Sequence, residues 1–228
     1  EELYQKRDKL ENVEEKIISL IKKKNNIKTK LLNLAEQLSK KRQKHADNLE
    51  IKLKQELKDL AMEDVRFKVD FKEKEISADG TDQIEFLISP NIGEDLKSLS
   101  KIASGGELSR IMLSLKTITA ALDQVDTLVF DEVDSGVGGK TAAKMASKLC
   151  QISNDRQIIC ITHLPQLASA ANHHFLIKKE KGENRTFTKI HALDKAERIK
   201  EIARMIGGTK MTDKTLAHAE EMLLLANE

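Results

Sequence analysis

The stretch LVFDEVDSGVGGKTA, residues 128–142, is central to the fold because it allows two incompatible interpretations. It contains Gly139-Lys140-Thr141, the tripeptide with which a phosphate-binding P-loop ends. A P-loop also needs a glycine five residues before its Gly-Lys pair, and Asp134 occupies that position. The carboxylate of Asp134, together with two acids just upstream, would repel the phosphate groups of a nucleotide. The stretch is therefore not predicted to be a P-loop.

The same stretch includes a strand signal that ends in two acids. Residues 125–130 are mainly apolar and rich in strand formers, and Asp131 and Glu132 follow them directly. A buried parallel strand places carboxylates in this way at the edge of an open α/β sheet, where ligands bind. One such carboxylate can hold Mg²⁺ while the next polarises an attacking water, as in nucleotide hydrolases. A strand that merely ends in solvated acids is the alternative, and the segment by itself favours it.

Composition narrows the class of protein. The 228 residues are 39% hydrophobic and 33% charged, which suits one ordinary domain plus an extended element. Lys and Arg together number 39 against 37 Asp and Glu, so the protein surface as a whole is not expected to be positively charged. An aromatic content of 3% leaves no set of rings on which the bases of single-stranded nucleic acid could stack. No secretory leader and no run long enough to span a bilayer is present, which favours a soluble, cytoplasmic protein. Cys150 and Cys160 lack metal-ligand spacing and are predicted to be reduced core residues.

The amino-terminal part has the pattern of a coiled coil. Apolar residues recur at a and d heptad positions from residue 3 to residue 38, without proline or glycine, which predicts a coiled-coil arm over residues 1–62. The phase of the heptad slips after residue 45, so a stutter or kink is expected around residues 42–48. Basic runs at residues 22–24 and 40–42 are interpreted as a solvated helical face, with a DNA-contacting strip as the alternative.

Residues 63–228 have the pattern of an α/β lobe. The segments VRFKVDF and QIEFLIS flank Asp79-Gly80, which predicts an antiparallel strand pair. The apolar run QIICIT predicts a second buried strand, which ends in Thr162-His163. A later hairpin is expected around residues 182–184, with a basic patch interpreted as a solvated turn. That patch consists of Lys178, Lys179, Lys181 and Arg185. The last helices are predicted near residues 194–206 and 212–226.

Two further segments are candidates for binding a phosphate group. Ser104-Gly105-Gly106 opens a helix, and Ser104 with Glu107 forms the pattern of a capping box, which is an ordinary helix start. Two glycines exceed what a cap requires, and they expose backbone N–H groups that suit a phosphate. His163 follows the second buried strand, and it is either structural or a hydrogen-bond donor to a terminal phosphate. The predicted apolar face of the helix consists of Leu108, Ile111, Met112, Leu115, Ile118 and Leu122.

The order of these signals resembles a known family. The motifs ASGGELSRIMLSLK, FDEVDSGVGGKTA and THLPQLA, with the later IARMIGG and HAEEMLL, resemble the carboxyl-terminal lobe of an ABC-type ATPase head of the SMC and Rad50 superfamily. Within that superfamily the motifs are most similar to those of the RecN family of bacterial DNA repair proteins. The resemblance covers all of the globular part, and the coil corresponds to a returning arm. It implies an α/β fold, with the lobe at residues 63–228 preceded by the coiled-coil helix.

The resemblance also implies roles for individual residues. Asp131 corresponds to the Walker B ligand of Mg²⁺, Glu132 to the general base for the attacking water, and His163 to the switch histidine. The signature motif contacts the γ-phosphate of ATP held by the opposite head, and the D-loop corresponds to residues 135–138. The signature residues are Ser104, Gly105, Gly106 and Glu107, and the D-loop positions expected at the nucleotide are Ser135 and Gly136.

Two positions depart from the wider superfamily. Ala103 replaces the usual leucine before the signature serine, and Gly138 stands where the D-loop often ends in aspartate, which puts the contact made by that acid in doubt. Lys140 and Thr141 lie beyond the D-loop and are expected to begin a helix.

No segment of the chain matches a Walker A loop. The resemblance therefore implies that an amino-terminal lobe supplies this loop and that the chain alone is inactive. It also implies a nucleoid-associated ATPase of double-strand-break repair, with ATP and Mg²⁺, DNA as a partner, no membrane, and a homodimer through ATP-bound heads.

Three other functions remain as alternatives. The first is a Rad50- or SMC-type DNA-tethering head that serves a nuclease or chromosome organisation, but the coil has no Cys-x-x-Cys for a zinc hook. The second is a transporter ATPase cassette, against which the heptad arm argues. The third is a structural coiled-coil protein, against which the intact acidic and signature motifs argue.

Overall fold

The chain forms two compact units. In the computed structural model, residues 2–102, 104–122, 125–181, 186–208 and 211–226 are described, without the side chains of residues 2–11, 121, 181 and 186. One unit consists of Glu1–Glu50 with Val69–Phe86, and the other of Ile51–Lys68 with Leu87–Glu228. The predicted domain boundary near residue 62 stays a prediction. Within the described residues, no helix combines the length and the hydropathy of a membrane span.

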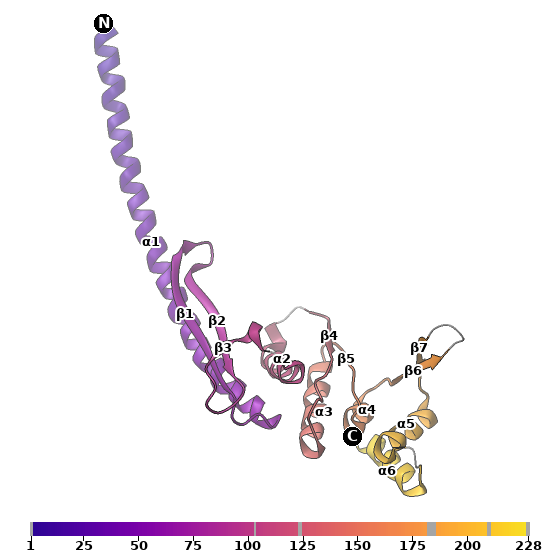
Figure 1. Cartoon of the computed structure of the whole chain (residues 1–228). Coiled ribbons are helices and arrows are strands. Elements are labelled where there is room, and N and C mark those ends of the chain that lie inside the picture. Colours follow the sequence, from indigo (N-terminus) through magenta and orange to yellow (C-terminus); the bar gives the residue numbers. More distant parts are fainter. Residues whose placement is uncertain (1, 103, 123–124, 182–185, 209–210, 227–228) are drawn as a thin grey trace. The chain divides into compact units, whose positions relative to one another are not determined.

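The predicted arm is one long helix, α1 (Glu2–Asp59), which Figure 1 shows as the extended indigo and violet element. The helix is continuous through residues 42–48, where the heptad phase slips. Its heptad stripe is exposed to solvent, because the described part of the chain offers it no partner helix. The exposed members of the predicted seam are Val13, Ile17, Leu20, Ile27, Leu31, Leu34 and Leu38. The side chains of Leu3 and Leu10 lie outside the described residues.

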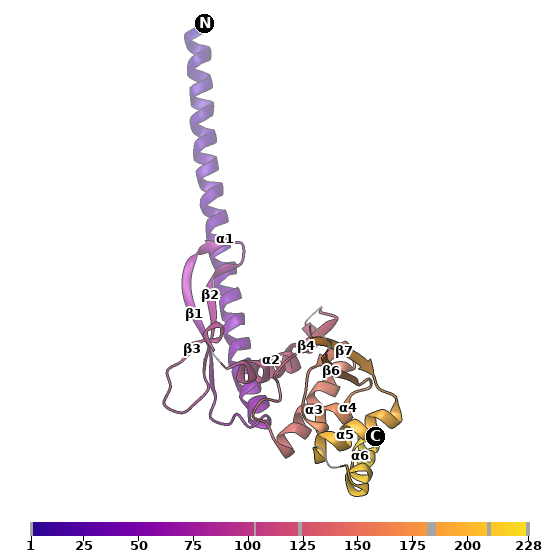
Figure 2. The same cartoon turned by 45° about the vertical axis from the view of Figure 1, so that its right-hand side comes forward.

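A β-hairpin lies along α1 in the first unit, as Figures 1 and 2 both show. Strands β1 (Arg66–Ser77) and β2 (Gly80–Ser89) are neighbours in one sheet and are joined by a two-residue turn, which confirms the predicted strand pair. The short strand β3 (Lys97–Ser98) extends this sheet, pairing antiparallel with residues 87–88 of β2.

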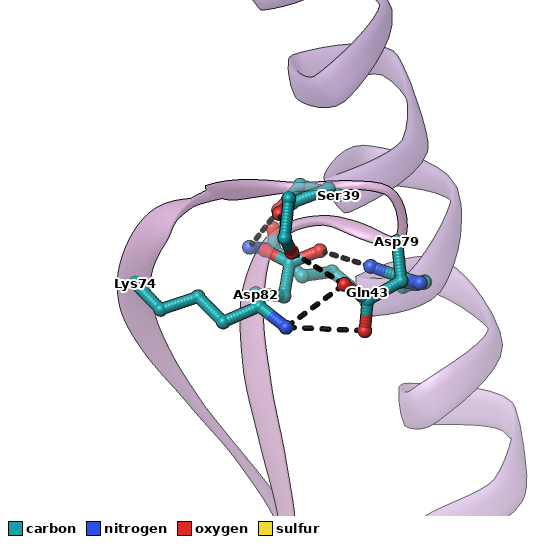
Figure 3. A network of polar contacts seen from close by, with 8 residues as sticks. Ser39, Gln43, Lys74, Asp79 and Asp82 are labelled. Atoms are coloured by element: carbon teal, nitrogen blue, oxygen red, sulfur yellow. Dashed lines mark hydrogen bonds and ion pairs between the residues drawn. The ribbon is translucent and has the colours of Figure 1, made fainter.

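Polar contacts fasten the hairpin to the helix, as Figure 3 shows. Asp82 of β2 accepts a hydrogen bond from Ser39, and its Oδ2 lies 2.9 Å from Nη1 of Arg42. The hydrogen bond from Ser39 and the charge of Arg42 lower the pKa of Asp82 below its usual value. Because the Asp82 side chain is only 9% exposed, these contacts replace most of the water that the carboxylate would otherwise bind.

The turn of the hairpin is closed by a second aspartate. Asp79 accepts hydrogen bonds from Ser77 Oγ at 2.5 Å and from Lys74 Nζ at 3.0 Å, and these contacts lower its pKa to about 2. Gly80 follows with a φ of +98°, a conformation that favours glycine. A Cβ at this position would also lie 3.3 Å from Leu38 Cδ2, so the turn sits tightly on the helix.

The second unit is built around two parallel strands, β4 (Thr127–Phe130) and β5 (Gln157–Cys160), which pair in register from Thr127 with Gln157 to Phe130 with Cys160. Both predicted strands are therefore present, and the structure shows that they pair in parallel. The prediction that the strands are buried is only half right, since Val129 is 62% exposed and Ile159 is 46% exposed. One face of this strand pair is uncovered within the described residues, whereas Phe130 on the other face is buried.

Helices cover the buried face of the strand pair. These are α2 (Gly105–Thr119), α3 (Gly139–Ser153) and α4 (Pro165–Ala170). Leu113 of α2, Met145 of α3 and Leu167 of α4 meet Phe130 in one hydrophobic core. The carboxyl-terminal end of α1 belongs to the same unit, where Lys148 of α3 forms ion pairs with Glu56 and Asp59.

Several sequence expectations about the second unit need correction. Leu113 and Ser114 of α2 are fully buried although neither lies on the predicted apolar face. Leu122 was assigned to that face, but it belongs to the 3₁₀ helix η2 (Ala120–Leu122) and is 84% exposed. Cys150 is exposed and is therefore no core residue. Cys160 is half-buried, and burial, with Asp134 and Asp131 nearby, raises the pKa of its thiol to about 12.

The chain continues with a hairpin and two helices. Strands β6 (Phe175–Lys181) and β7 (Thr186–Ala192) pair antiparallel, while the predicted turn at residues 182–184 and Arg185 lie outside the described residues. Helices α5 (Lys195–Gly207) and α6 (Asp213–Leu225) confirm the predicted helices, and each begins with a complete capping box. Their facing sides form a small core of Ile202, Ala203, Ala219 and Leu223.

The contacts of Asp82 predict a pH-dependent contribution to stability. Asp82→Asn should lower the free energy of unfolding at pH 7 by about 1–3 kcal/mol, because it weakens hydrogen bonds to a charged group. A lowered folded-state pKa stabilises the fold above the unfolded pKa, and this contribution is lost as the pH falls through the folded value. The difference between variant and wild type should therefore shrink below about pH 4. Urea denaturation at pH 7 and pH 3 measures it, with the exposed Asp95→Asn as the matched control. Equal stability of both variants at pH 7 would contradict the proposed role of Asp82.

Candidate functional site

The candidate site lies where the two parallel strands end. Because β4 and β5 run in the same direction, the residues that follow them emerge at the same edge of the strand pair. There they line a cavity of about 520 Å³. Its lining consists of Asp131, Glu132, Asp134, Ser135, Gly136, Ile161, Thr162 and His163. The structure thus brings together five of the residues singled out from the sequence, namely Asp131, Glu132, Ser135, Gly136 and His163.

The two acids after β4 have an unusual backbone. Glu132 has a φ of +55°, in the left-handed region that non-glycine residues seldom adopt. Its backbone N–H donates to Oδ1 of Asp131 at 2.9 Å, which occupies one carboxylate oxygen of Asp131. Both side chains are exposed at the cavity. Backbone strain of this kind occurs in proteins where the surrounding structure holds a functional group in place.

Asp134 is the residue whose importance the sequence analysis missed. It was considered only as an argument against a P-loop, yet it is 3% exposed, the most deeply buried carboxylate among the described residues. Its Oδ2 accepts hydrogen bonds from Thr162 Oγ1 at 2.6 Å and from the backbone N–H of His163 at 2.9 Å. The ring Nδ1 of His163 lies 3.1 Å from the same oxygen. An acid four residues after the end of a strand gives no sequence signal for such burial.

The signature residues lie at the amino-terminal end of α2. Ser104 is the N-cap, and its Oγ accepts a hydrogen bond from the Glu107 backbone N–H at 3.4 Å. The reciprocal bond from the Glu107 side chain is not formed among the described residues, so the predicted capping box is only half present. Ala103 lies outside the described residues.

Gly105 and Gly106 approach the acids of the cavity closely. A Cβ at Gly105 would overlap the carboxylate of Glu132, and a Cβ at Gly106 would lie 2.8 Å from Cβ of Ser135. Glycine is therefore needed for close packing at Gly106, whereas at Gly105 the overlap is with the end of a flexible, exposed side chain that can move aside. This requirement is separate from the exposure of backbone N–H groups that the sequence analysis considered.

Two more residues of α2, both missed by the sequence analysis, hold the helix against the cavity. Ser109 Oγ donates to the backbone carbonyl of Asp131 at 2.7 Å, and Arg110 Nη1 donates to that of Ser135 at 2.6 Å. Burial lowers the pKa of Arg110, while the charge of Glu107 raises it in part. Their positions one turn into the helix place them beside the turn after β4, a relation that sequence spacing alone does not reveal.

The cavity suits a metal ion that keeps several water ligands better than a metal ion that is held entirely by protein side chains. Among the described residues, no group of three or more His, Cys, Asp or Glu side chains is arranged to hold a metal. Mg²⁺ usually takes one or two carboxylates and completes its shell with water and phosphate oxygens. Asp131 fits this pattern, because only Oδ1 accepts the neighbouring N–H.

The tripeptide that resembled a P-loop has a different position. Gly139 is the first residue of α3, so Lys140 and Thr141 begin a helix as predicted. A second cavity, of about 380 Å³, lies beside α5 and α6 and includes His173, Arg198 and Glu220. This second cavity contains none of the residues predicted to act on a nucleotide.

The solved structures support the fold assignment. An Smc head domain with a coiled coil and joint from Pyrococcus yayanosii matches 88% of this chain and 35% of its own length, with 20% identity and a TM-score of 0.53. This likeness confirms the predicted fold class, because the chain has the α/β fold of part of such a head domain, with a long helix before it.

Curated proteins show closer relatives, although no protein-family model matches the chain. The DNA repair protein RecN of Bacillus subtilis is 40% identical over 97% of this chain and 41% of its own length. That of Haemophilus influenzae is 42% identical over 83% of this chain and 34% of its own length. The chain thus spans about two fifths or less of the length of these relatives. With this identity over most of its residues, the chain belongs to the RecN family of DNA repair proteins.

Proposed function

We propose that this chain forms the carboxyl-terminal lobe and returning arm of an ATPase that acts in DNA double-strand-break repair and recombination. The observation that carries the proposal is that Asp131, Glu132, Ser135, Gly136 and His163 line the same cavity. These are the residues that the family resemblance assigns to Mg²⁺ binding, water activation, the D-loop and the switch. The names of the relatives, DNA repair proteins, support the role in repair.

Each residue has a role that its surroundings support. The exposed carboxylate of Asp131 would hold Mg²⁺, which neutralises charge on the phosphate oxygens when it is bound. Glu132 would accept the proton of the attacking water, since its side chain reaches the same cavity. His163 would contact the terminal phosphate through its ring. Ser135 and Gly136 would approach the nucleotide from the turn after β4.

The amino-terminal end of α2 would serve the nucleotide held by a second head. Helix N-termini attract phosphate through exposed N–H groups and the helix dipole, and Ser104 and Gly105 are exposed there. Glu107 lies in the same first turn. The complete protein would therefore act as a homodimer whose heads join around ATP, with an amino-terminal lobe supplying the Walker A loop.

The arm would pair with a second helix, and the complete protein would link DNA through the resulting coiled coil. Helix α1 exposes its heptad stripe, which suits an antiparallel outgoing helix of the same protein. The partners proposed for the complete protein are therefore its own amino-terminal lobe, a second head and DNA in the bacterial nucleoid. The alternative function, a Rad50- or SMC-type head that serves a nuclease or chromosome organisation, would use the same cavity.

The role of Glu132 predicts the effect of an isosteric change. In the full-length protein, Glu132→Gln should reduce ATP turnover by at least about 100-fold, because the amide cannot accept a proton. ATP binding and head dimerisation should persist. Single-turnover kinetics measure the step, and Glu73→Gln, an exposed change on the hairpin, is the matched control. Hydrolysis by Glu132→Gln at the wild-type rate would remove Glu132 from this role.

The role of the α2 terminus predicts a separation of binding from dimerisation. Ser104→Arg should leave ATP binding by a single head intact, while ATP-driven dimerisation and turnover fail, because the side chain blocks the site for the opposite phosphate. Gly106→Arg should have the same effect, but it also disturbs the contact with Ser135. Ser100→Arg, which adds the same side chain at an exposed position before α2, is the control. Equilibrium binding and light scattering measure the two steps. Loss of binding to a monomeric head would contradict the assignment to the second head.

The absence of a GxxxxGK[ST] sequence predicts the behaviour of the chain alone. Residues 1–228 should show no saturable Mg²⁺-dependent ATP hydrolysis, because no segment of the sequence matches the loop that surrounds the phosphates of a bound nucleotide. Addition of the amino-terminal lobe with its outgoing helix should restore hydrolysis. A coupled ATPase assay measures both states. Robust hydrolysis by the chain alone would mean that residues 136–141 bind phosphate after all.

A further inference from the structure

The buried carboxylate of Asp134 connects the two strand ends of the cavity. Asp134 lies in the turn between β4 and α3, whereas Thr162 and His163 directly follow β5. All three contacts converge on one oxygen, Oδ2, at distances of 2.6, 2.9 and 3.1 Å. Burial of a carboxylate is costly unless hydrogen bonds and charge partners compensate for the lost water. The arrangement of residues 162–163 supplies this compensation.

The contacts have defined donors. Leu164 N–H donates to Thr162 Oγ1 at 3.0 Å, which leaves the hydroxyl hydrogen of Thr162 directed to Asp134. An ionised carboxylate can only accept hydrogen bonds. A lasting contact between Asp134 Oδ2 and His163 Nδ1 therefore requires a hydrogen on Nδ1. The opposite nitrogen, Nε2, is then the one that remains for a ligand.

The ring of His163 needs a contact that fixes its orientation and its tautomer. Its side chain is 71% exposed, whereas that of Asp134 is 4% exposed. A histidine side chain at the surface samples several rotamers and two neutral tautomers, and each costs free energy to select. Asp134 Oδ2, 3.1 Å from the ring Nδ1, is the side-chain atom that can hold this ring in one orientation.

We propose that Asp134 is a positioning residue that orients the His163 ring, with Nδ1–H toward Asp134 and Nε2 toward the cavity. A donor at Nε2 then requires the imidazolium form, whose charge Asp134 balances, as the aspartate does in a Ser-His-Asp triad. The inference rests on the proposed ATPase function, because it concerns how His163 is presented to the terminal phosphate. It also makes the turn after β4 and the loop after β5 act as one unit.

A purely structural role for Asp134 leads to different measurements. In that case the carboxylate would only hold Thr162 and the loop after β5, and its loss would affect activity whether or not His163 is present. If Asp134 acts through His163, its effect disappears once the histidine is removed. A double-mutant cycle separates the two cases.

The cycle uses the full-length protein with Asp134→Asn, His163→Ala and the double variant. Asp134→Asn should lower kcat by at least about tenfold with KM changed less than about twofold, as expected for an outer partner of a functional histidine. In the His163→Ala background the same change should alter kcat by less than about twofold. Thr162→Val, which removes the other side-chain contact of Asp134, is the matched control. It should lower the melting temperature, whereas its effect on kcat should be smaller than that of Asp134→Asn.

Two outcomes of the cycle would overturn the proposal. One is wild-type kcat for a folded Asp134→Asn variant, and the other is a full effect of Asp134→Asn in the absence of His163. The Glu132→Gln variant keeps this failure distinct from failure of the proposed function. If the wild type hydrolyses ATP and Glu132→Gln does not, the function holds whatever Asp134 does.

A measurement on the wild type decides the question if Asp134→Asn does not fold. Nitrogen chemical shifts of ¹⁵N-histidine-labelled protein report which ring nitrogen carries hydrogen, and His163→Ala identifies the signal. We expect a protonated Nδ1 in the wild type. A neutral ring with hydrogen only on Nε2 would overturn the proposal, and this result does not depend on ATP hydrolysis.

Discussion

The parallel pairing of β4 with β5 is the constraint on which the candidate site depends. Because the two strands share a direction, the turn after Phe130 and the loop after Cys160 emerge at the same edge. Residues about 30 positions apart in the sequence, such as Glu132 and His163, therefore line one cavity. The hydrophobic core formed by α2, α3 and α4 keeps the strand pair in place from one side only. The exposed side chains of Val129 and Ile159 show that the other side lacks a cover within the described residues.

The cavity is also shaped by the close approach of α2. Gly106 lies so near Ser135 that a larger residue would not fit without a shift, and Gly105 lies beside the Glu132 carboxylate. Arg110 adds a hydrogen bond to the same turn. The helix start, the turn after β4 and the loop after β5 thus form one connected polar region. A change in any one of these three segments would therefore affect the other two through direct contacts.

The first unit has a different organisation, because it relies on polar contacts and a long helix instead of a large core. The hairpin of β1 and β2 is attached to α1 through Asp82, which interacts with Ser39 and Arg42. The apolar stripe of α1 remains in water, and a single helix with such a stripe gains little stability by itself. The free surface of the arm and the open face of the strand pair are both consistent with a chain that spans about two fifths of its curated relatives.

Local sequence was sufficient for the type and order of most elements. The heptad spacing predicted α1, alternation predicted the hairpin of β1 and β2, and the apolar runs before Asp131 and Thr162 predicted strands β4 and β5, because these patterns reflect short-range periodicity. The motifs also singled out Asp131, Glu132 and His163. Only the tertiary structure decided the burial of Asp134, the half-formed cap at Glu107, the exposure of Cys150 and the burial of Leu113. These properties depend on which residues from distant segments pack together, and no local pattern records such contacts.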